Sequence, residues 1–374
     1  MPTTNRRYDI DWLRVIAIGL LLLYHVAIAF QPWGIMLGFI TNDKPWQSLW
    51  IPMTILNVWR IPLLFFVSGM GVYFAIQNRN WKQLLKERTK RIFIPFVFGI
   101  FVIAPIQLYI SQLYYNRELN YVPNPAHLWF LGNIFVYVII LLPIFFYLKR
   151  NEEGRIVGWI KKCLSNPIGL LIVIAVFIAE VLLVQPNPYE LYAMTWHGFF
   201  LGLFAFFFGF CFVLSGSSFW NMLLKWRWLL LAAAVSFYTY RLLQFQMKVP
   251  NFQLSIESNC WIFSIFAFGY KHLNKPGKAL SYLSQAAYPV YIMHMIFLFM
   301  ASRLIFPLDI NVYLKFVLLL AFTVAGCFGF YEFIIRRIKF IRPLFGLIMK
   351  SHNQSLVNNQ IKDITISQPG TSTL

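Results

Sequence analysis

Charged side chains are scarce in this sequence. Only 12% of its 374 residues are Asp, Glu, Lys or Arg, and 59% are hydrophobic, against about 25% charged and roughly 45–50% apolar in typical soluble proteins. A soluble chain would have too little interior to bury that much apolar surface. The composition therefore excludes an ordinary soluble protein and predicts an all-α, polytopic membrane protein whose main solvent is lipid.

Acidic residues and cysteines are also few. The chain has 13 acidic against 32 basic residues and a net charge of +19. Basic cytoplasmic loops of a membrane protein explain this excess, so we expect no nucleic-acid partner. The histidines lie on different hydrophobic runs, without the spacing of a metal-binding motif. Four cysteines, far apart, predict neither a disulfide framework nor a zinc site; they are Cys163, Cys211, Cys260 and Cys327.

Ten mostly apolar runs are long enough, at about 20 residues each, to be candidates for crossing a bilayer. They cover residues 12–32, 52–77, 92–114, 128–148, 167–184, 197–214, 228–245, 258–272, 285–306 and 312–335. The first run could instead be a secretory signal, because Arg6 and Arg7 precede it. Asp9, Asp11 and Arg14 at its start favour a membrane span.

The distribution of Lys and Arg predicts the orientation. With the N-terminus inside, the inner segments hold 24 of these residues and the outer segments 5. Because cytoplasmic loops are enriched in Lys and Arg, we expect an even number of spans, both termini in the cytoplasm, and a multi-pass protein of the inner (plasma) membrane. Residues 1–350 are predicted to form a single transmembrane domain, and residues 351–374 a polar, disordered cytoplasmic tail.

The first hydrophobic run contains two ionisable residues, which lipid should exclude. Arg14 and His25 are 11 residues apart, close to three helical turns, so they point to one side of a helix about 16 Å apart along its axis. Asp11 precedes Arg14 by three residues and can pair with it. Two interpretations remain open: a functional stripe, or a snorkelling Arg14 with a His25 that bonds a neighbouring helix.

A basic segment, WKQLLKERTKRIFIP, precedes the third span. Arg88 and Arg91 are three residues apart, so in a helix they face nearly the same way and could bind an anionic ligand near the cytoplasmic surface. The alternative is a positive cluster that fixes topology and contacts lipid phosphates, which we favour for Lys82, Lys86 and Lys90.

Further polar residues lie in or beside the spans. His294, midway along 285–306, could line a cavity or bond within the core. His127 begins HLWFLGN at the outer face and could touch a substrate or belong to the interfacial aromatic belt. Arg60 lies near the outer end of the second span. Ser68 lies deeper, beside Gly69, where small residues permit close helix packing.

Several motifs, in their order and spacing across residues 8–345, resemble the acyltransferase-3 family of bacterial integral membrane proteins. They are IDWLR, LLLYH, RIPLLFFVSGM, KERTKRIFIP, HLWFL and YPVYIMH. The IDWLR start and the late YEFIIRRIKFIRPLFG are most similar to the subgroup of periplasmic glucan succinyltransferases. The resemblance implies a ten-helix core and a catalytic His25, with Arg14, Arg88 and Arg91 binding the donor.

The resemblance also implies the reaction. Members of the acyltransferase-3 family transfer an acetyl or succinyl group from cytoplasmic acyl-CoA to a carbohydrate acceptor outside. Acyl-CoA is then a co-substrate rather than a bound cofactor. His25 would act as general base on the acceptor hydroxyl, or would itself be acylated first. The competing class is a transporter or flippase for a glycan or lipid-linked substrate. Paired halves with broken helices are typical of transporters, and the prolines do not fall in such corresponding places.

Overall fold

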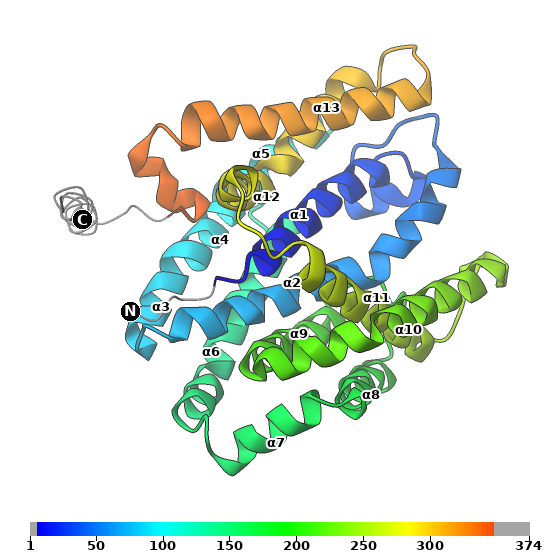
Figure 1. Cartoon of the computed structure of the whole chain (residues 1–374). Helices are drawn as coiled ribbons and strands as arrows, with labels where there is room; N and C mark the ends of the chain where they lie inside the picture. Colours follow the sequence, from blue (N-terminus) through cyan, green and yellow to red (C-terminus); the bar gives the residue numbers. More distant parts are fainter. Residues whose placement is uncertain (1–5, 348–374) are drawn as a thin grey trace, which may run out of the picture.

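The computed structural model describes residues 6–347, and all regular secondary structure in that range is helical (Figure 1). The predicted tail, residues 351–374, lies outside it. The thirteen α-helices of residues 6–347 are α1 (Tyr8–Ile28), α2 (Trp50–Ile76), α3 (Trp81–Arg88), α4 (Ile94–Phe98), α5 (Ala104–Tyr114), α6 (Trp129–Arg150), α7 (Arg155–Leu164), α8 (Pro167–Val184), α9 (Trp196–Leu214), α10 (Gly216–Leu243), α11 (Asn251–His272), α12 (Lys278–Ile305) and α13 (Val312–Phe330).

Eight helical segments of the described chain are long and apolar enough to cross a membrane. They are Tyr8–Ile28, Gln47–Ile76, Trp81–Tyr114, Ala126–Arg150, Pro167–Val184, Trp196–Leu214, Lys278–Ile305 and Val312–Ile335. Each coincides with one of the ten predicted spans, and the chain is a polytopic membrane protein. The other two predicted spans fall on α10 and α11, which are long helices of more polar sequence; Ser255, Glu257, Ser258 and Asn259 all lie in α11.

The third span begins earlier than the sequence predicted, at residue 81 rather than 92. Asn80 caps α3: its side chain accepts a hydrogen bond from the Gln83 backbone N–H, and the Gln83 side chain accepts one from the Asn80 N–H. Reciprocal bonds of this kind satisfy free donors at a helix start. The helical path then continues to α5 through two π-helical segments, Thr89–Phe93 and Gly99–Ile103.

Helices α2 and α9 approach each other more closely than side chains would allow. A Cβ atom on Gly69 would lie 1.9 Å from the Phe206 carbonyl oxygen, and one on Gly209 would lie 2.1 Å from the Phe66 carbonyl oxygen. The two glycines therefore let the backbones touch reciprocally, as small residues do between membrane helices. This contact agrees with the close packing predicted at Gly69.

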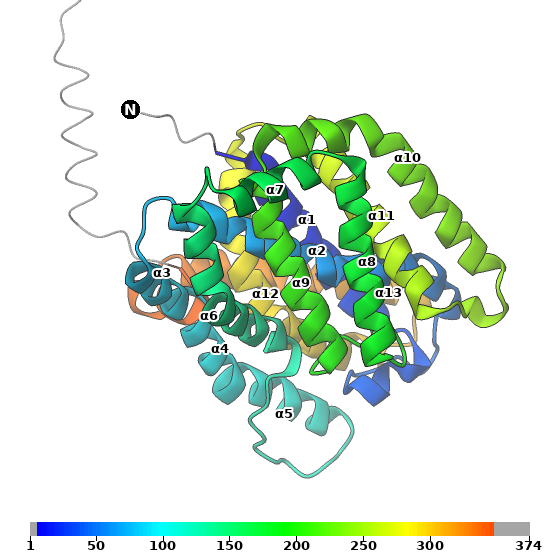
Figure 2. The same cartoon turned by 90° about the horizontal axis from the view of Figure 1, so that it is seen from below.

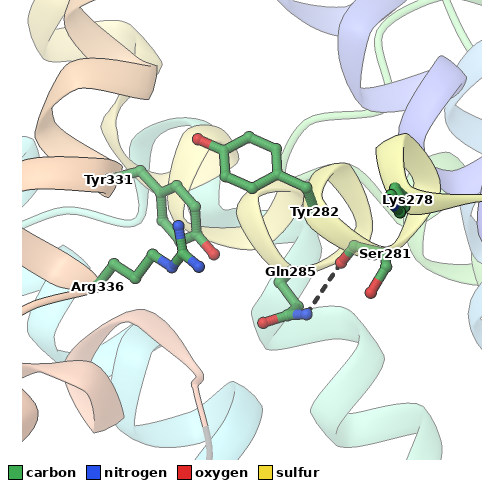
Figure 3. Close-up of a pocket in the computed structure, with 6 residues that line it drawn as sticks. All are labelled: Lys278, Ser281, Tyr282, Gln285, Tyr331 and Arg336. Atoms are coloured by element: carbon green, nitrogen blue, oxygen red, sulfur yellow. Dashed lines mark hydrogen bonds between the residues drawn. The ribbon is translucent and has the colours of Figure 1, made fainter.

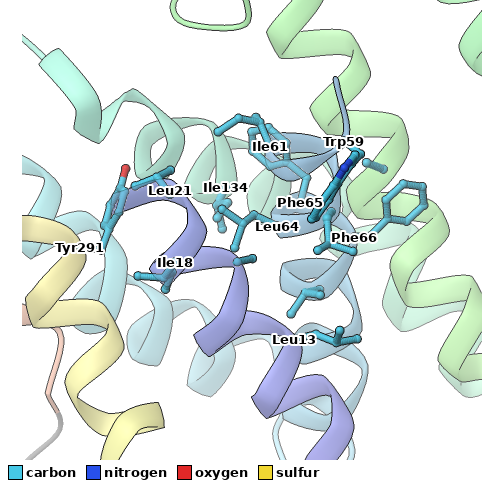
Figure 4. Close-up of a cluster of buried hydrophobic side chains, with 14 of the residues drawn as sticks. Leu13, Ile18, Leu21, Trp59, Ile61, Leu64, Phe65, Phe66, Ile134 and Tyr291 are labelled. Carbon is cyan, nitrogen blue, oxygen red and sulfur yellow. The ribbon is translucent and has the colours of Figure 1, made fainter. Parts of the chain in front are cut away.

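Helix α1 packs against α2, and helix α8 packs against α9, on either side of this central pair. Leu13 of α1 lies toward α2, whereas Ile18 and Leu21 of α1 lie on the side toward Tyr291 of α12 (Figure 4). Helix α8 lies beside α9 (Figure 2). Because α1 packs against α2, α11, α12 and α13, it is an integral part of the core, as the membrane-span interpretation requires.

The bundle has two distinct ends. We call one the basic end: it gathers residues 6–7, 77–91, 149–166, 215–227, 271–284 and 336–347. The Tyr8 N–H donates to Asn274 Oδ1, and the Arg7 guanidinium lies 4.0 Å from the Trp220 ring centroid. Helix α3 marks this end at the left of Figure 1.

The other end, which we call the opposite end, gathers residues 29–49, 115–127, 185–195, 244–250 and 306–311. Lys315 Nζ donates to Asn42 Oδ1 and to the Phe306 carbonyl, and Asn251 Nδ2 donates to the Pro186 carbonyl. These bonds connect loops that are far apart in the sequence, so the helices run between two well-defined surfaces.

Candidate active site

His25 points into the bundle. Its Nδ1 lies 2.8 Å from Nε2 of His294 on α12, and the two rings are parallel, with 3° between their planes and 5.0 Å between their centroids. The His294 side chain is buried, whereas His25 keeps part of its surface accessible. The structure therefore joins two histidines that the sequence placed on different spans.

The hydrogen bonds of His294 fix where the protons lie. His294 Nδ1 is 2.6 Å from the Tyr291 carbonyl, which can only accept, so Nδ1 carries a proton. In a neutral ring Nε2 is then the acceptor, and His25 Nδ1 must donate to it. A neutral His25 consequently presents Nε2 as its basic atom, and no residue within 6–347 occupies that nitrogen.

His127 is the third member of this group. Its Nε2 donates to the Ile292 carbonyl at 3.2 Å, and its ring centroid lies 4.9 Å from that of His294. The Tyr291 hydroxyl donates to the His127 backbone carbonyl at 2.6 Å. The start of HLWFLGN is thus bonded to α12 beside the histidine pair. Within residues 6–347 these side chains do not form a metal-binding arrangement.

Arg60 and Ser68, both on α2, have different surroundings. The Arg60 guanidinium lies 3.8 Å from the ring centroid of Tyr24, the neighbour of His25 in sequence. Arg60 is only 3% exposed, and its buried Nε and Nη1 have no hydrogen-bond partner in the described chain. Ser68 instead donates to the Leu64 carbonyl of its own helix at 2.7 Å. The helix backbone therefore satisfies Ser68, whereas Arg60 keeps free donors.

Two of the predicted donor-binding arginines converge on one point of α2. Arg88 Nη2 donates to the Gly71 carbonyl at 3.4 Å, and a Cβ on Gly71 would lie 3.3 Å from Arg14 Nη2. Arg14 also lies 3.5 Å from Asp11, the pairing predicted from their spacing. The first and third spans thus bring their cations together against the second.

Arg91 is oriented differently. Its Nη1 pairs with Glu87 at 3.2 Å, and its side chain is 48% exposed. The π-helical segment begins at Thr89, between the two arginines, so their spacing is not that of a regular α-helix. Arg14, Arg88 and Arg91 still lie within Coulomb range of one another. The structure therefore groups the three cations but gives each its own partner.

Two tyrosines of α12, which the sequence analysis missed, lie between the arginines and the histidines. Tyr288 lies within Coulomb range of Arg88 and Arg91, and its buried hydroxyl has no partner in the described chain. Its ring centroid is 6.5 Å from that of Tyr291, which is 5.9 Å from that of His294. Residues 288, 291 and 294 share one helix face, which was visible in the YPVYIMH motif.

Cavities open at the basic end. One, of about 230 Å³, is lined by Lys278, Ser281, Tyr282, Gln285, Tyr331 and Arg336 (Figure 3). A second, of about 440 Å³, shares Lys278 and Ser281 with it and adds Arg6. Cationic side chains line both cavities, but Arg14, Arg88 and Arg91 line neither.

Two buried pairs at the opposite end were also missed. Arg241 Nη2 lies 2.7 Å from Glu257 Oε1, and His197 Nδ1 lies 2.9 Å from Glu180 Oε1; all four side chains are at most 2% exposed. Arg241 falls within the predicted span 228–245, and its side chain is buried inside the bundle. Each partner comes from a different helix, so no local spacing in the sequence revealed these pairs.

These features define a polytopic helical membrane protein with a buried histidine centre. A family model described as an acyltransferase domain matches residues 7–332, so the chain belongs to the acyltransferase-3 family. The protein is therefore a membrane-bound acyltransferase that transfers groups other than aminoacyl groups. No curated protein and no solved structure matches the chain at the significance required.

Proposed function

We propose that this acyltransferase moves an acetyl or succinyl group from cytoplasmic acyl-CoA to a hydroxyl of an extracytoplasmic glycan, with His25 as general base. Within the family, its first and last motifs favour the periplasmic glucan succinyltransferase subgroup. The observation that carries the proposal is the hydrogen-bonded series from the Tyr291 carbonyl through His294 to His25 Nδ1, which leaves His25 Nε2 free.

The chemistry follows from that free nitrogen. As the acceptor hydroxyl attacks the thioester carbonyl, its proton passes to His25 Nε2 and a new C–O ester bond forms. The C–S bond then breaks, the thiolate of CoA leaves, and the proton on His25 neutralises it. His294 orients His25 and shares the positive charge that develops on it, as a second group does for the base of hydrolytic triads.

The donor is proposed to bind at the basic end. Acyl-CoA carries phosphate groups, and charge-assisted hydrogen bonds from arginine to phosphate are among the stronger polar contacts. Arg14, Arg88 and Arg91 supply three cations in one place. Arg14 and His25 are separated by about 16 Å along α1, a distance that the long, thin pantetheine arm can span past Tyr288 and Tyr291.

This arrangement requires the basic end to face the cytoplasm, with both termini on that side of the plasma membrane. The excess of Lys and Arg in the segments of that end supports this orientation. Membership of an acyltransferase family favours an enzyme over the transporter or flippase alternative.

Purified full-length protein in lipid nanodiscs tests the proposal. Radiolabelled acetyl-CoA and succinyl-CoA are supplied with the carbohydrate fraction of host cells that lack the protein. We expect label in the carbohydrate, dependent on His25. Sugar movement across the bilayer without label transfer would contradict the proposal. Label that remains on the protein when carbohydrate is omitted would favour an acylated His25 over direct base catalysis.

A further inference from the structure

Arg60 is a buried cation that forms no ion pair with a carboxylate of the described chain. It is only 3% exposed. Its Nε and Nη1 are buried without a hydrogen-bond partner in that range. An unpaired charge inside a membrane protein is costly, so such a residue needs a functional explanation.

Two other buried ionisable groups at the opposite end of the bundle have partners within the chain, as expected for residues with a structural role. Arg241, equally buried, pairs with Glu257 at 2.7 Å and donates to the Thr54 carbonyl at 3.0 Å. His197 pairs with Glu180. The chain thus gives each of these two buried groups a carboxylate partner and leaves Arg60 without one.

The groups around Arg60 hold it in place without neutralising it. Its guanidinium lies 3.8 Å from the Tyr24 ring centroid, and the hydroxyls of Tyr24 and Tyr192 near it are neutral. The Tyr192 hydroxyl is already used, since it donates to the Val58 carbonyl at 3.1 Å. The cation–π contact compensates only part of the cost of desolvation. The free N–H groups therefore remain available to an anion.

Arg60 lies close enough to His25 for its charge to act on the imidazole. An anion that binds Arg60 is consequently near the point where the thioester carbonyl is expected to be attacked. In succinyl-CoA two methylene groups separate a carboxylate from that carbonyl, whereas acetyl-CoA has no second charged group. Guanidinium groups bind carboxylates through paired N–H donors.

We propose that Arg60 binds the free carboxylate of a dicarboxylic acyl group, so that the enzyme transfers succinyl rather than acetyl groups. This inference rests on the proposed function and names its acyl substrate. The reacting bonds are those given above, and Arg60 forms no covalent bond. Arg60 selects the donor because its guanidinium pairs with the carboxylate at the end of the acyl chain.

Competing donors test this specificity in the full-length enzyme. We expect wild type to favour succinyl-CoA over acetyl-CoA by at least about 100-fold in kcat/KM, because a buried site for a charged group rejects a ligand that lacks it. Arg60→Gln should lose most of the succinyl rate, keep acetyl transfer within about threefold, and so remove the preference. Arg60→Lys should retain part of it.

Thr54→Val is the matched control on α2, because Thr54 is also buried and its hydroxyl donates to the Ile51 carbonyl of its own helix; the substitution leaves the Thr54 carbonyl in place for Arg241 and should keep the succinyl preference. Equal loss of both rates in Arg60→Gln, or a wild type that favours acetyl-CoA, would overturn the assignment. If wild type transfers neither group, the proposed function itself fails, and the two failures are therefore distinguishable.

Discussion

The basic end and the opposite end of the bundle both carry charge, but they hold it differently. At the basic end two pairs keep an exposed arginine: the side chains of Arg6 and Asp11 are 56% and 19% accessible, and those of Arg91 and Glu87 are 48% and 11% accessible. Arg7 with Asp9 is the buried pair of this end, at 14% and 0%. At the opposite end Arg241, Glu257, Glu180 and His197 are almost fully buried. Exposed pairs contribute little to stability, whereas buried charges are costly unless paired.

The difference teaches how to weigh ionisable residues in such a protein. Apart from Arg14, Arg88 and Arg91, the cations at the basic end fit the rule for membrane orientation and need no further role. Groups inside the bundle must each be explained by a partner or by a ligand. His25 has His294 as its partner, and Arg60 has no carboxylate within the described chain. Variants of His25, His294, Arg88 and Arg336 separate these two kinds of charged group.

Replacing His25 with Ala should have the largest effect. Without a base on the acceptor hydroxyl we expect acyl transfer to fall by about 10³-fold, while CoA affinity, measured calorimetrically, stays within about twofold. His272→Ala, an exposed histidine at the basic end, is the control and should transfer normally. Normal glycan acylation by His25→Ala would exclude its assignment as base.

His294→Ala should reduce kcat by about 10- to 100-fold, as loss of an orienting partner does elsewhere. The reason is that His25 Nδ1 would lose its acceptor and the ring could bind its proton on either nitrogen. His294→Gln offers a carbonyl oxygen to the same donor and should recover part of the rate. An unchanged kcat in His294→Ala, measured with saturating donor, would show that the pair has no catalytic role.

The sequence predicted part of this centre and could not predict the rest. Arg14, His25 and Asp11 share one helix, so residue spacing alone placed them on one face. His294 lies 269 positions from His25, and a contact of that kind depends on how α1 and α12 pack. The same holds for the pairs Arg241–Glu257 and Glu180–His197.

The prediction of membrane spans from the sequence was limited in the same way. Eight were visible because lipid-facing helices are apolar on average. Helices α10 and α11 were located in the sequence, but the polar residues of α11 are buried rather than exposed to lipid. The hydrophobicity of the sequence is therefore a weak indicator of these two helices. The π-helical segment at Thr89 has no reliable sequence signal, so the separate orientations of Arg88 and Arg91 could not be foreseen.

Donor affinity should distinguish the two arginines of the basic segment. Arg88→Ala should weaken CoA binding by about 10-fold, since the partly buried guanidinium loses charge-assisted bonds to phosphate. Arg91→Ala, which removes a more exposed cation already paired with Glu87, should weaken it by about threefold or less. Lys82→Ala is the control, with isothermal titration calorimetry as the measurement. Unchanged affinity in both arginine variants would return them to a role in topology.

The smallest effect is expected for an exposed pair at the basic end. Arg336 Nη1 lies 2.8 Å from Glu332 Oε1, and the Arg336 side chain is 55% accessible. Glu332 raises the pKa of Arg336, which therefore stays charged at all ordinary pH values. Arg336→Gln should leave the thermal midpoint of the purified protein unchanged, because water replaces the lost partner. A clear drop in the midpoint would show that exposed pairs of this end do stabilise the fold.

The reciprocal contact of Gly69 and Gly209 has a consequence for movement. Since neither position can accept one more carbon atom without displacing a carbonyl of its neighbour, α2 and α9 behave as a single rigid block. Sliding or rocking during turnover is then expected outside this pair, where α1 packs between α2 and α12. Substrates would come to a stationary guanidinium at residue 60, rather than being carried past it by a moving span.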